Sequence, residues 1–308
     1  MFRNLRFYRV ISPWPESEQE LSDILANKEF SPCSAFSERS AGWEPPAGPE
    51  SESLSRSVNG ADLMQLRTQS RVLPLAAIKE ALEVRVAEYR ARMEQDPPRA
   101  ELRRLREETR DELLPKALVK SERMRAFYLQ SDSLLVIDVA TDARAEWFID
   151  HLRFCFSSFR CVPLAFNAPP AELLTRIFMG ESLARFTLGR ECRMQDLMDS
   201  KAIATWRDID LSDASIRQHV LEGMKLTHLG VEFDRVMTCV FSEDAVFGKV
   251  RFNTGEAVDQ PDTEDPLSRL DADFVLLSGT VSRLIRDLCK LLGGFTSVEQ
   301  ARTHLAQE

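Results

Sequence analysis

Two helix-like segments separated by a pair of prolines constrain the fold of this chain more than any other feature. Pro74 opens the first segment at a position where a helix tolerates proline. Apolar residues then recur at every third or fourth position, which predicts an amphipathic helix with a stripe of Leu75, Ile78, Leu82, Val86, Tyr89 and Met93. Pro97 and Pro98 end that helix, and a second helical segment follows. We therefore predict an antiparallel helical hairpin.

The second segment carries a stripe of arginines. Their spacings of 4, 3 and 4 place them on one face of a helix: Arg99, Arg103, Arg106 and Arg110. Two interpretations of this arginine stripe are open. It is either a solvated face whose charges pair with nearby carboxylates, or a surface that meets an anionic partner. The nearby carboxylates are Glu107, Glu108, Asp111 and Glu112.

The arginine stripe belongs to an acidic chain, whose formal net charge is −9. Residues 71–125 hold 14 Lys/Arg and 11 Asp/Glu, whereas the remainder holds 26 and 38. The most acidic segment is 256–273. A protein charged in this way repels a polyanion with most of its surface and attracts it with a small part. This distribution points to nucleic acid as a partner of the hairpin region.

Further cations follow the stripe, and aromatic residues are absent between Tyr89 and Phe127. Cations without aromatic rings favour contact with the phosphates of a duplex over stacking on single-stranded bases. We expect phosphate contacts from a subset of the basic residues in this region. The candidates are Arg85, Arg92, Arg99, Arg103, Arg106, Lys116, Lys120 and Arg123.

The rest of the chain clusters its strand-like segments, with no regular alternation of strand and helix, which favours an α+β fold with antiparallel sheets. Asn59-Gly60 predicts a tight hairpin turn. Near the end we expect a strand over 273–277 and helices over 280–292 and 298–306. The expected domains are a central α+β domain (1–73 plus 126–168), the helical hairpin (74–125, with 169–223 forming a tip region) and a C-terminal α+β domain (224–308).

Several function classes lack their sequence signatures. The chain has no glycine-rich phosphate loop, dinucleotide fingerprint or GxSxG motif. Its six cysteines are scattered with no CxxC pair, so we expect neither disulfides nor a metal site, and no cofactor. The first nine residues do not resemble a secretory signal, and no apolar run is long enough to span a bilayer. We therefore expect a cytoplasmic protein with no membrane partner.

Two pairs of carboxylates leave one enzymatic alternative open. The pairs are Asp208 with Asp210 and Asp271 with Asp273. On a strand, residues two apart point to the same side, and two such carboxylates could hold a divalent metal for phosphodiester hydrolysis. Acidic doublets are also common in turns and at helix starts, so we expect no catalytic residue and keep a metal nuclease as the alternative. A third class is an interaction scaffold that uses the 74–114 hairpin as a partner helix pair.

Six short motifs together resemble the bacterial RdgC family of recombination-associated nucleoid proteins. Each motif alone is weakly specific, but their order and spacing fit up to Gly293-Gly294. The motifs are 30–33 (FSPC), 42–46 (GWEPP), 58–60 (VNG), 72–83 (VLP followed by IKEALE), 113–118 (LLPKAL) and 270–279 (LDADFVLLSG).

The resemblance implies a homodimer that closes into a ring around double-stranded DNA, with a basic central hole. It also implies binding that is independent of sequence, restraint of RecA-driven strand exchange, and a place in the nucleoid. Where the family carries phenylalanine at one dimer contact, this chain has Leu118, and the opposing region around Arg207 departs from the family pattern. The resemblance favours a structural role for Asp271 and Asp273.

Overall fold

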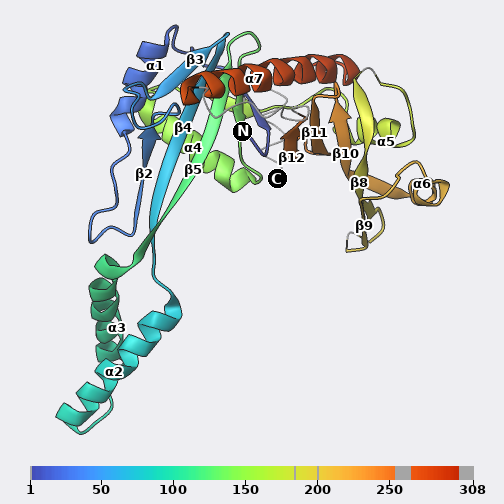
Figure 1. Ribbon diagram of the computed structural model, residues 1–308. Helices are drawn as coiled ribbons and strands as arrows, with labels where there is room; N and C mark the ends of the chain where they lie inside the picture. The colour runs from blue at the N-terminus through green and yellow to red at the C-terminus, as the bar shows by residue number, and fades with distance from the viewer. Residues whose placement is uncertain (1, 184, 200, 254–264, 298–308) are drawn as a thin grey trace. The chain divides into compact units, whose positions relative to one another are not determined.

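The structure of the chain, a computed structural model, describes residues 2–183, 185–199, 201–253 and 265–297 (Figure 1). The expected helix over 298–306 and the acidic residues from 256 to 264 lie outside the described residues. The chain divides into two compact units. The first unit comprises residues 1–27, 45–64 and 124–308, and the second comprises 28–44 and 65–123.

The first unit contains one part of a seven-stranded sheet. Strand β1 pairs antiparallel with β6 and β7, and β6 pairs with the last residues of β5. The helices of this part are α1, which Ser17 caps by accepting a hydrogen bond from the Glu20 amide, η1 and α4. The bounds are β1 (Arg6–Val10), α1 (Glu18–Leu25), η1 (Ala26–Lys28), β5 (Leu118–Leu129), β6 (Leu134–Ile137), α4 (Asp142–Cys155) and β7 (Cys161–Pro163).

The turn predicted at Asn59-Gly60 is confirmed. It joins β3 (Ser55–Val58) to β4 (Ala61–Val72), and its two residues have φ of 50° and 76°. Both positive values are those of a two-residue turn that matches the twist of a hairpin. Strand β4 then continues from the first unit into the second.

The first unit also holds a five-stranded antiparallel sheet in the order β12-β11-β10-β8-β9. Gly189 of β8 faces Gly230 of β10 so closely that a Cβ on Gly189 would lie 2.7 Å from the Gly230 carbonyl carbon. Helices α5 and α6 belong to this part. The bounds are α5 (Pro170–Phe178), β8 (Phe186–Asp196), β9 (Ile203–Arg207), α6 (Ala214–Leu221), β10 (Met224–Phe233), β11 (Met237–Ser242) and β12 (Phe247–Phe252).

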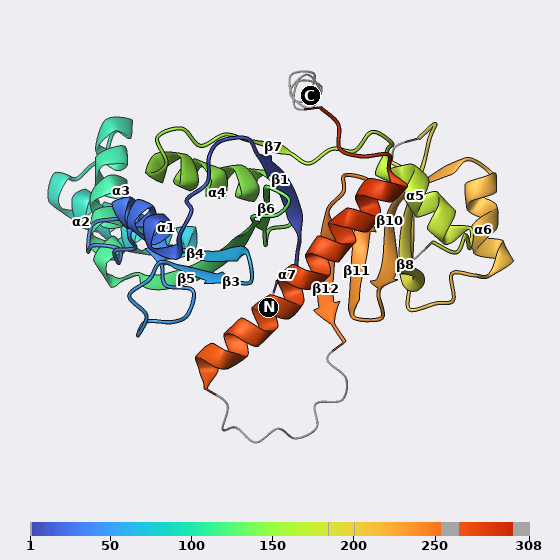
Figure 2. The same cartoon turned by 90° about the horizontal axis from the view of Figure 1, so that it is seen from above.

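One continuous helix, α7 (Pro266–Leu291), replaces the expected strand over 273–277 and helix over 280–292 (Figure 2). That prediction was wrong. The apolar run at 274–277 fits a buried strand or a buried helix equally well. The helix forms because its buried positions continue at helical spacing and join one core with the five-stranded sheet: Phe274, Leu277, Val281, Leu284 and Leu288.

The second unit consists of β2, the rest of β4, the start of β5 and the helical hairpin. Strand β2 (Arg39–Glu44) pairs with β4 from Arg39↔Ser70 to Glu44↔Gln65. The hairpin is α2 (Leu75–Met93) and α3 (Arg99–Leu113), followed by the short helix η2 (Leu114–Lys116) (Figure 1). The predicted hairpin and the α+β class are therefore confirmed, while the division into three domains stays a prediction.

The apolar seam of the hairpin is shorter than the sequence pattern indicated. Helix α2 buries only Ile78 and Tyr89. The side chains at the two ends of its apolar stripe stay in solvent, with Leu75 73% and Met93 48% exposed. Glu94, in a left-handed conformation, caps α2 ahead of the prolines. Among the described residues, no helix is both long and apolar enough to cross a membrane.

Candidate nucleic-acid interface

Arg71 fixes the base of the hairpin. Its Nη1 donates hydrogen bonds to the carbonyl oxygens of Leu114 (3.2 Å), Pro115 (3.1 Å) and Ala117 (3.3 Å). Its Nη2 and Nε donate to the carbonyl oxygen of Ser34, at 3.1 and 3.3 Å. One side chain at the end of β4 thus holds the junction between α3 and β5. Since all these acceptors are neutral, the positive charge of Arg71 is not cancelled by them.

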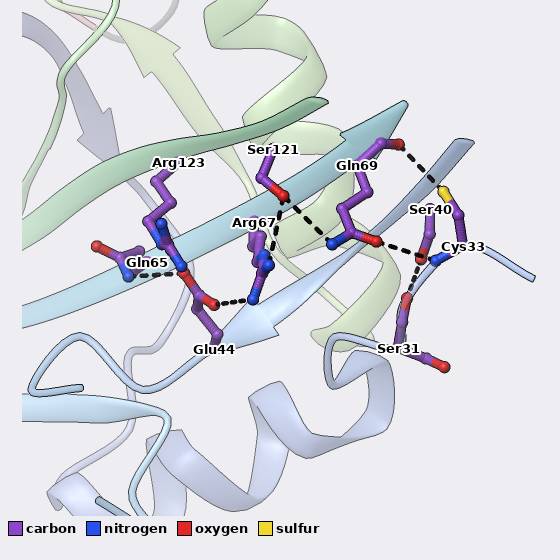
Figure 3. A network of polar contacts seen from close by, with 9 residues as sticks. All are labelled: Ser31, Cys33, Ser40, Glu44, Gln65, Arg67, Gln69, Ser121 and Arg123. Carbon is purple, nitrogen blue, oxygen red and sulfur yellow. Dashed lines mark hydrogen bonds and ion pairs between the residues drawn. The ribbon is translucent and has the colours of Figure 1, made fainter. Parts of the chain in front are cut away.

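Glu44, the last residue of β2, accepts hydrogen bonds from three side chains on β4 and β5 of the second unit (Figure 3). Its Oε1 accepts from Gln65 Nε2 (2.9 Å) and from Arg123 Nε, and its Oε2 accepts from Arg67 Nη1 (3.3 Å). The Arg67 guanidinium also lies 4.5 Å from the ring centroid of Phe30, a cation–π contact. The Glu44 side chain is only 14% exposed, so these hydrogen bonds are partly shielded from water.

The same polar network continues along the strands (Figure 3). Ser121 Oγ accepts hydrogen bonds from Arg67 Nη2 (3.3 Å) and Gln69 Nε2 (3.2 Å). Gln69 Oε1 in turn accepts from the backbone amide of Cys33 (3.1 Å). Together with the hydrogen bonds of Glu44, these contacts link β2, β4 and β5 through their side chains.

The arginine stripe lies on the single helix α3, as predicted, but its members differ in their partners. Arg103 faces Glu107 at 3.8 Å, and Arg110 pairs with Glu38. Arg99 and Arg106 are exposed, and neither has an ion-pair or hydrogen-bond partner among the described residues. Two members of the stripe are therefore paired with carboxylates, as the first interpretation expects, and contact with an anionic partner stays a prediction for the other two.

Arg104 lies outside the stripe and is held by two carboxylates. It donates to Glu108 at 2.9 Å and faces Glu101 at 3.8 Å. The hydrogen bond to Glu108, together with the charge of both carboxylates, raises the pKa of Arg104. Both carboxylates lie on α3, so Arg104 pairs within its own helix.

The remaining candidate cations also differ in how firmly they are held. Arg85 is 27% exposed and pairs with both Glu108 (3.8 Å) and Glu112. The guanidinium of Arg92 lies 6.0 Å from the ring centroid of Tyr89. Lys116 faces Glu112 at 3.5 Å, Lys120 faces Glu122 at 2.6 Å, and Arg123 pairs with Glu44.

All eight candidate cations lie in the second unit. An ion pair between exposed side chains is worth at most about 1 kcal/mol, so a phosphate can displace its carboxylate. Lys116, Lys120 and Arg103 are held only in this way. Arg85 and Arg123 are held more firmly, because the first has two carboxylates and the second a shielded one. The sequence could not identify Arg85 and Arg123 as the more firmly held cations, since their partners are distant along the chain.

The two residues expected at a dimer contact lie in different units. Leu118, at the start of β5, is 80% exposed, and its neighbour Val119 is 46% exposed. Arg207 is an exposed residue at the end of β9 in the first unit. Leu118 and Val119 therefore leave apolar surface in solvent at the start of β5, and their role in a dimer contact stays a prediction.

Neither carboxylate pair lies on a strand, the arrangement that the metal-nuclease alternative required. Asp271 is on α7, where it binds the guanidinium of Arg56 through two hydrogen bonds, one of 3.0 Å from Nε and one from Nη2, which raises the pKa of Arg56. Asp208 occupies a turn with φ of 57°, and Asp210 accepts hydrogen bonds from the amide (2.9 Å) and hydroxyl (2.7 Å) of Ser212. Over the described residues, no three His, Cys, Asp or Glu residues are grouped so that they could hold a metal ion.

Fold and site together define an α+β protein whose second unit presents a cation-rich helical hairpin. The chain belongs to the RdgC family, whose family model, described as "Putative exonuclease, RdgC", matches residues 1–295.

Curated relatives cover almost the whole chain. "Recombination-associated protein RdgC" of Tolumonas auensis is 27% identical over 95% of this chain and 98% of its own length. The proteins of the same name from Shewanella sediminis and Shewanella putrefaciens are each 28% identical. They cover 95% and 97% of this chain, and 98% and 99% of their own lengths.

Proposed function

We propose that this protein binds double-stranded DNA without sequence preference, as a homodimer that closes into a ring, and that it restrains RecA-driven recombination. Its site of action would be the bacterial nucleoid, and its only chemistry would be binding. The observation that carries the proposal is the second unit's hairpin, where Arg99 and Arg106 have no partner among the residues that the structure describes and Arg103 has only a weak one. The relatives' name, recombination-associated protein, supports the same process.

The charge distribution supports duplex binding through the phosphates. Carboxylates repel the polyanion over most of the chain, so attraction is confined to the surface that carries the cations. Guanidinium groups contact phosphate oxygens through paired hydrogen bonds without reading base edges. The candidate cations would therefore bind every duplex with similar affinity.

Charge reversal of Arg103→Glu together with Arg106→Glu tests this proposal. The double variant is expected to lose affinity for unrelated duplexes to the same extent. The matched control is Arg153→Glu with Arg176→Glu, which makes the same change in net charge on exposed arginines of the first unit and is expected to bind almost like the wild type. Loss of binding to one duplex sequence only would contradict the proposal.

Ring closure is tested by topology. A ring loaded on a closed circular duplex stays bound when the salt concentration is raised, whereas it slides off a linear duplex of the same sequence. Sizing of the free protein is expected to give a dimer, and Leu118→Asp is expected to weaken it, with Val84→Asp as an exposed control on α2. Equal release from circular and linear DNA would contradict a closed ring.

Nuclease activity is the second candidate, because the family model carries an exonuclease description. Labelled single-stranded and double-stranded DNA incubated with the protein and magnesium or manganese separates the two functions. The binding proposal predicts that both substrates stay intact at protein concentrations that saturate the duplex. If either substrate is shortened, and this activity co-purifies with the protein, the protein is a nuclease instead.

A further inference from the structure

A surface cavity of about 420 Å³ lies at the base of the hairpin, entirely within the second unit. Its volume is in the range of cavities that bind small molecules or a few residues of a peptide. The end of β4, the first turn of α2, α3 and the segment before β2 all contribute to its wall. The cavity therefore depends on the same junction that Arg71 fixes.

The cavity wall has a net positive charge that internal pairing does not cancel. Four arginines and two glutamates line it. Each glutamate forms an ion pair with one arginine: Glu38 with Arg110, and Glu107 with Arg103. Arg71 donates only to neutral carbonyl oxygens, and over the described residues Arg106 has no partner. Carboxylates therefore neutralise neither Arg71 nor Arg106 over the described residues, and Arg106 also keeps its N–H donors for a ligand that carries carboxylates or phosphates.

The rest of the wall is aliphatic. It is formed by Leu73, Leu75, Ile78 and Leu114. Leu75 is 73% exposed although it belongs to an apolar stripe, whereas Ile78 and Leu114 are buried. A DNA backbone offers such side chains nothing to cover them. An aliphatic or aromatic side chain would remove them from water, which is favourable by about 25 cal/mol per Å² of apolar surface.

We infer that this cavity binds an acidic peptide segment of a partner protein, with an apolar side chain inserted next to its carboxylates. Both features of the cavity are needed to define this ligand. The positive charge accounts for its carboxylates, and the aliphatic wall accounts for its apolar side chain. Arg106 also belongs to the candidate DNA-binding set, so the peptide and DNA compete for it. The partner would thereby displace the hairpin from DNA. The peptide interaction itself does not depend on the proposed DNA binding.

The experiment measures fluorescence anisotropy of a labelled pentapeptide with four aspartates and a C-terminal leucine, added to the full-length protein without DNA. A second peptide with glycine in place of the leucine has the same charge. We expect the leucine peptide to bind at least about tenfold more tightly, as burial of one leucine implies. Equal binding of the two peptides would overturn the inference, because the surface would then be a general anion site.

Two matched variants separate the cavity from the DNA site. Leu75→Ser removes an exposed wall residue without a change in charge, and Val84→Ser makes a similar change on α2 outside the cavity. Leu75→Ser is expected to lose the preference for leucine and to keep its affinity for duplex DNA. Val84→Ser is expected to behave as the wild type in both assays. If no peptide binds up to about 1 mM, or if Leu75→Ser leaves the preference intact, the inference is wrong.

Discussion

The guanidinium of Arg71 donates a 3.2 Å hydrogen bond to the carbonyl oxygen of Leu114, where α3 gives way to η2. The same guanidinium also donates hydrogen bonds to the carbonyl oxygens of Pro115 and Ala117, which follow Leu114 along the chain. The hairpin that carries the arginine stripe is therefore attached to β4 by a side chain as well as by the backbone.

Arg71→Ala is expected to loosen the hairpin base. The variant leaves several carbonyl oxygens without their donor, which costs about 1–3 kcal/mol of unfolding free energy. Amide hydrogen exchange is expected to rise in the segment from 114 to 118. Arg71→Lys can donate to only some of these carbonyl oxygens, so its amide exchange rate is expected to lie between those of Arg71→Ala and the wild type. Unchanged exchange in the alanine variant would show that the backbone alone holds the junction.

Arg106→Gln is expected to weaken duplex binding more than Arg85→Gln. Arg106 has no partner to release over the described residues, whereas Arg85 must first leave Glu108 and Glu112. The dependence of log K on log salt is expected to fall by about 1 for Arg106→Gln. A smaller change is expected for Arg85→Gln. Duplex titrations at several salt concentrations measure both effects. A larger loss of affinity for Arg85→Gln than for Arg106→Gln would show that internal ion pairs do not decide which arginines bind phosphate.

Glu44→Gln is expected to change stability and DNA affinity in opposite directions. The substitution weakens the hydrogen bonds from Arg67 and Arg123 to a shielded carboxylate, which costs about 1–3 kcal/mol. It also removes one negative charge beside two cations, so the duplex is expected to bind more tightly at low salt. Glu181→Gln, a carboxylate of the first unit, serves as the charge-matched control. Weaker DNA binding by Glu44→Gln in the folded protein would contradict this account.

His228 is expected to make the protein less stable in mild acid. Burial, and next to it the charge of Arg193, lowers the pKa of His228 below its usual value near 6.5. As the pH falls below about 6.5, the unfolded chain takes up a proton at this histidine and the folded chain does not, so stability falls. Urea midpoints at pH 7.5 and 5.5 are expected to differ less in His228→Gln than in the wild type. An equal difference would remove His228 as the cause.

Local signals allowed much of the fold to be predicted from the sequence. Asn59-Gly60 specified its turn, and the apolar spacing and prolines specified the hairpin, because each of these depends on neighbours along the chain. Helix α7 was missed because Ser278 and Gly279 interrupt the pattern, although Ser278 donates its hydroxyl to the Phe274 carbonyl within the helix. A long helix packed on a sheet can accommodate such residues, and only the tertiary contacts reveal it.

The candidate site was less accessible to sequence reasoning. The arginine stripe could be located from spacing alone, but the partners that separate Arg106 from Arg110 could not. Arg110 pairs with Glu38, more than seventy residues earlier in the chain. Arg71 gave no local signal, since its acceptors lie at Ser34 and between Leu114 and Ala117. Contacts between distant segments decide which charges remain available, and no periodicity encodes them.

The salt dependence of binding to unrelated duplexes tests the central claim most directly. About six to ten phosphate contacts predict a slope of log K against log salt of about −5 to −9, the same for every sequence, between about 50 and 200 mM salt. A flat response, or a slope that differs between sequences, would contradict binding through the cations of the hairpin.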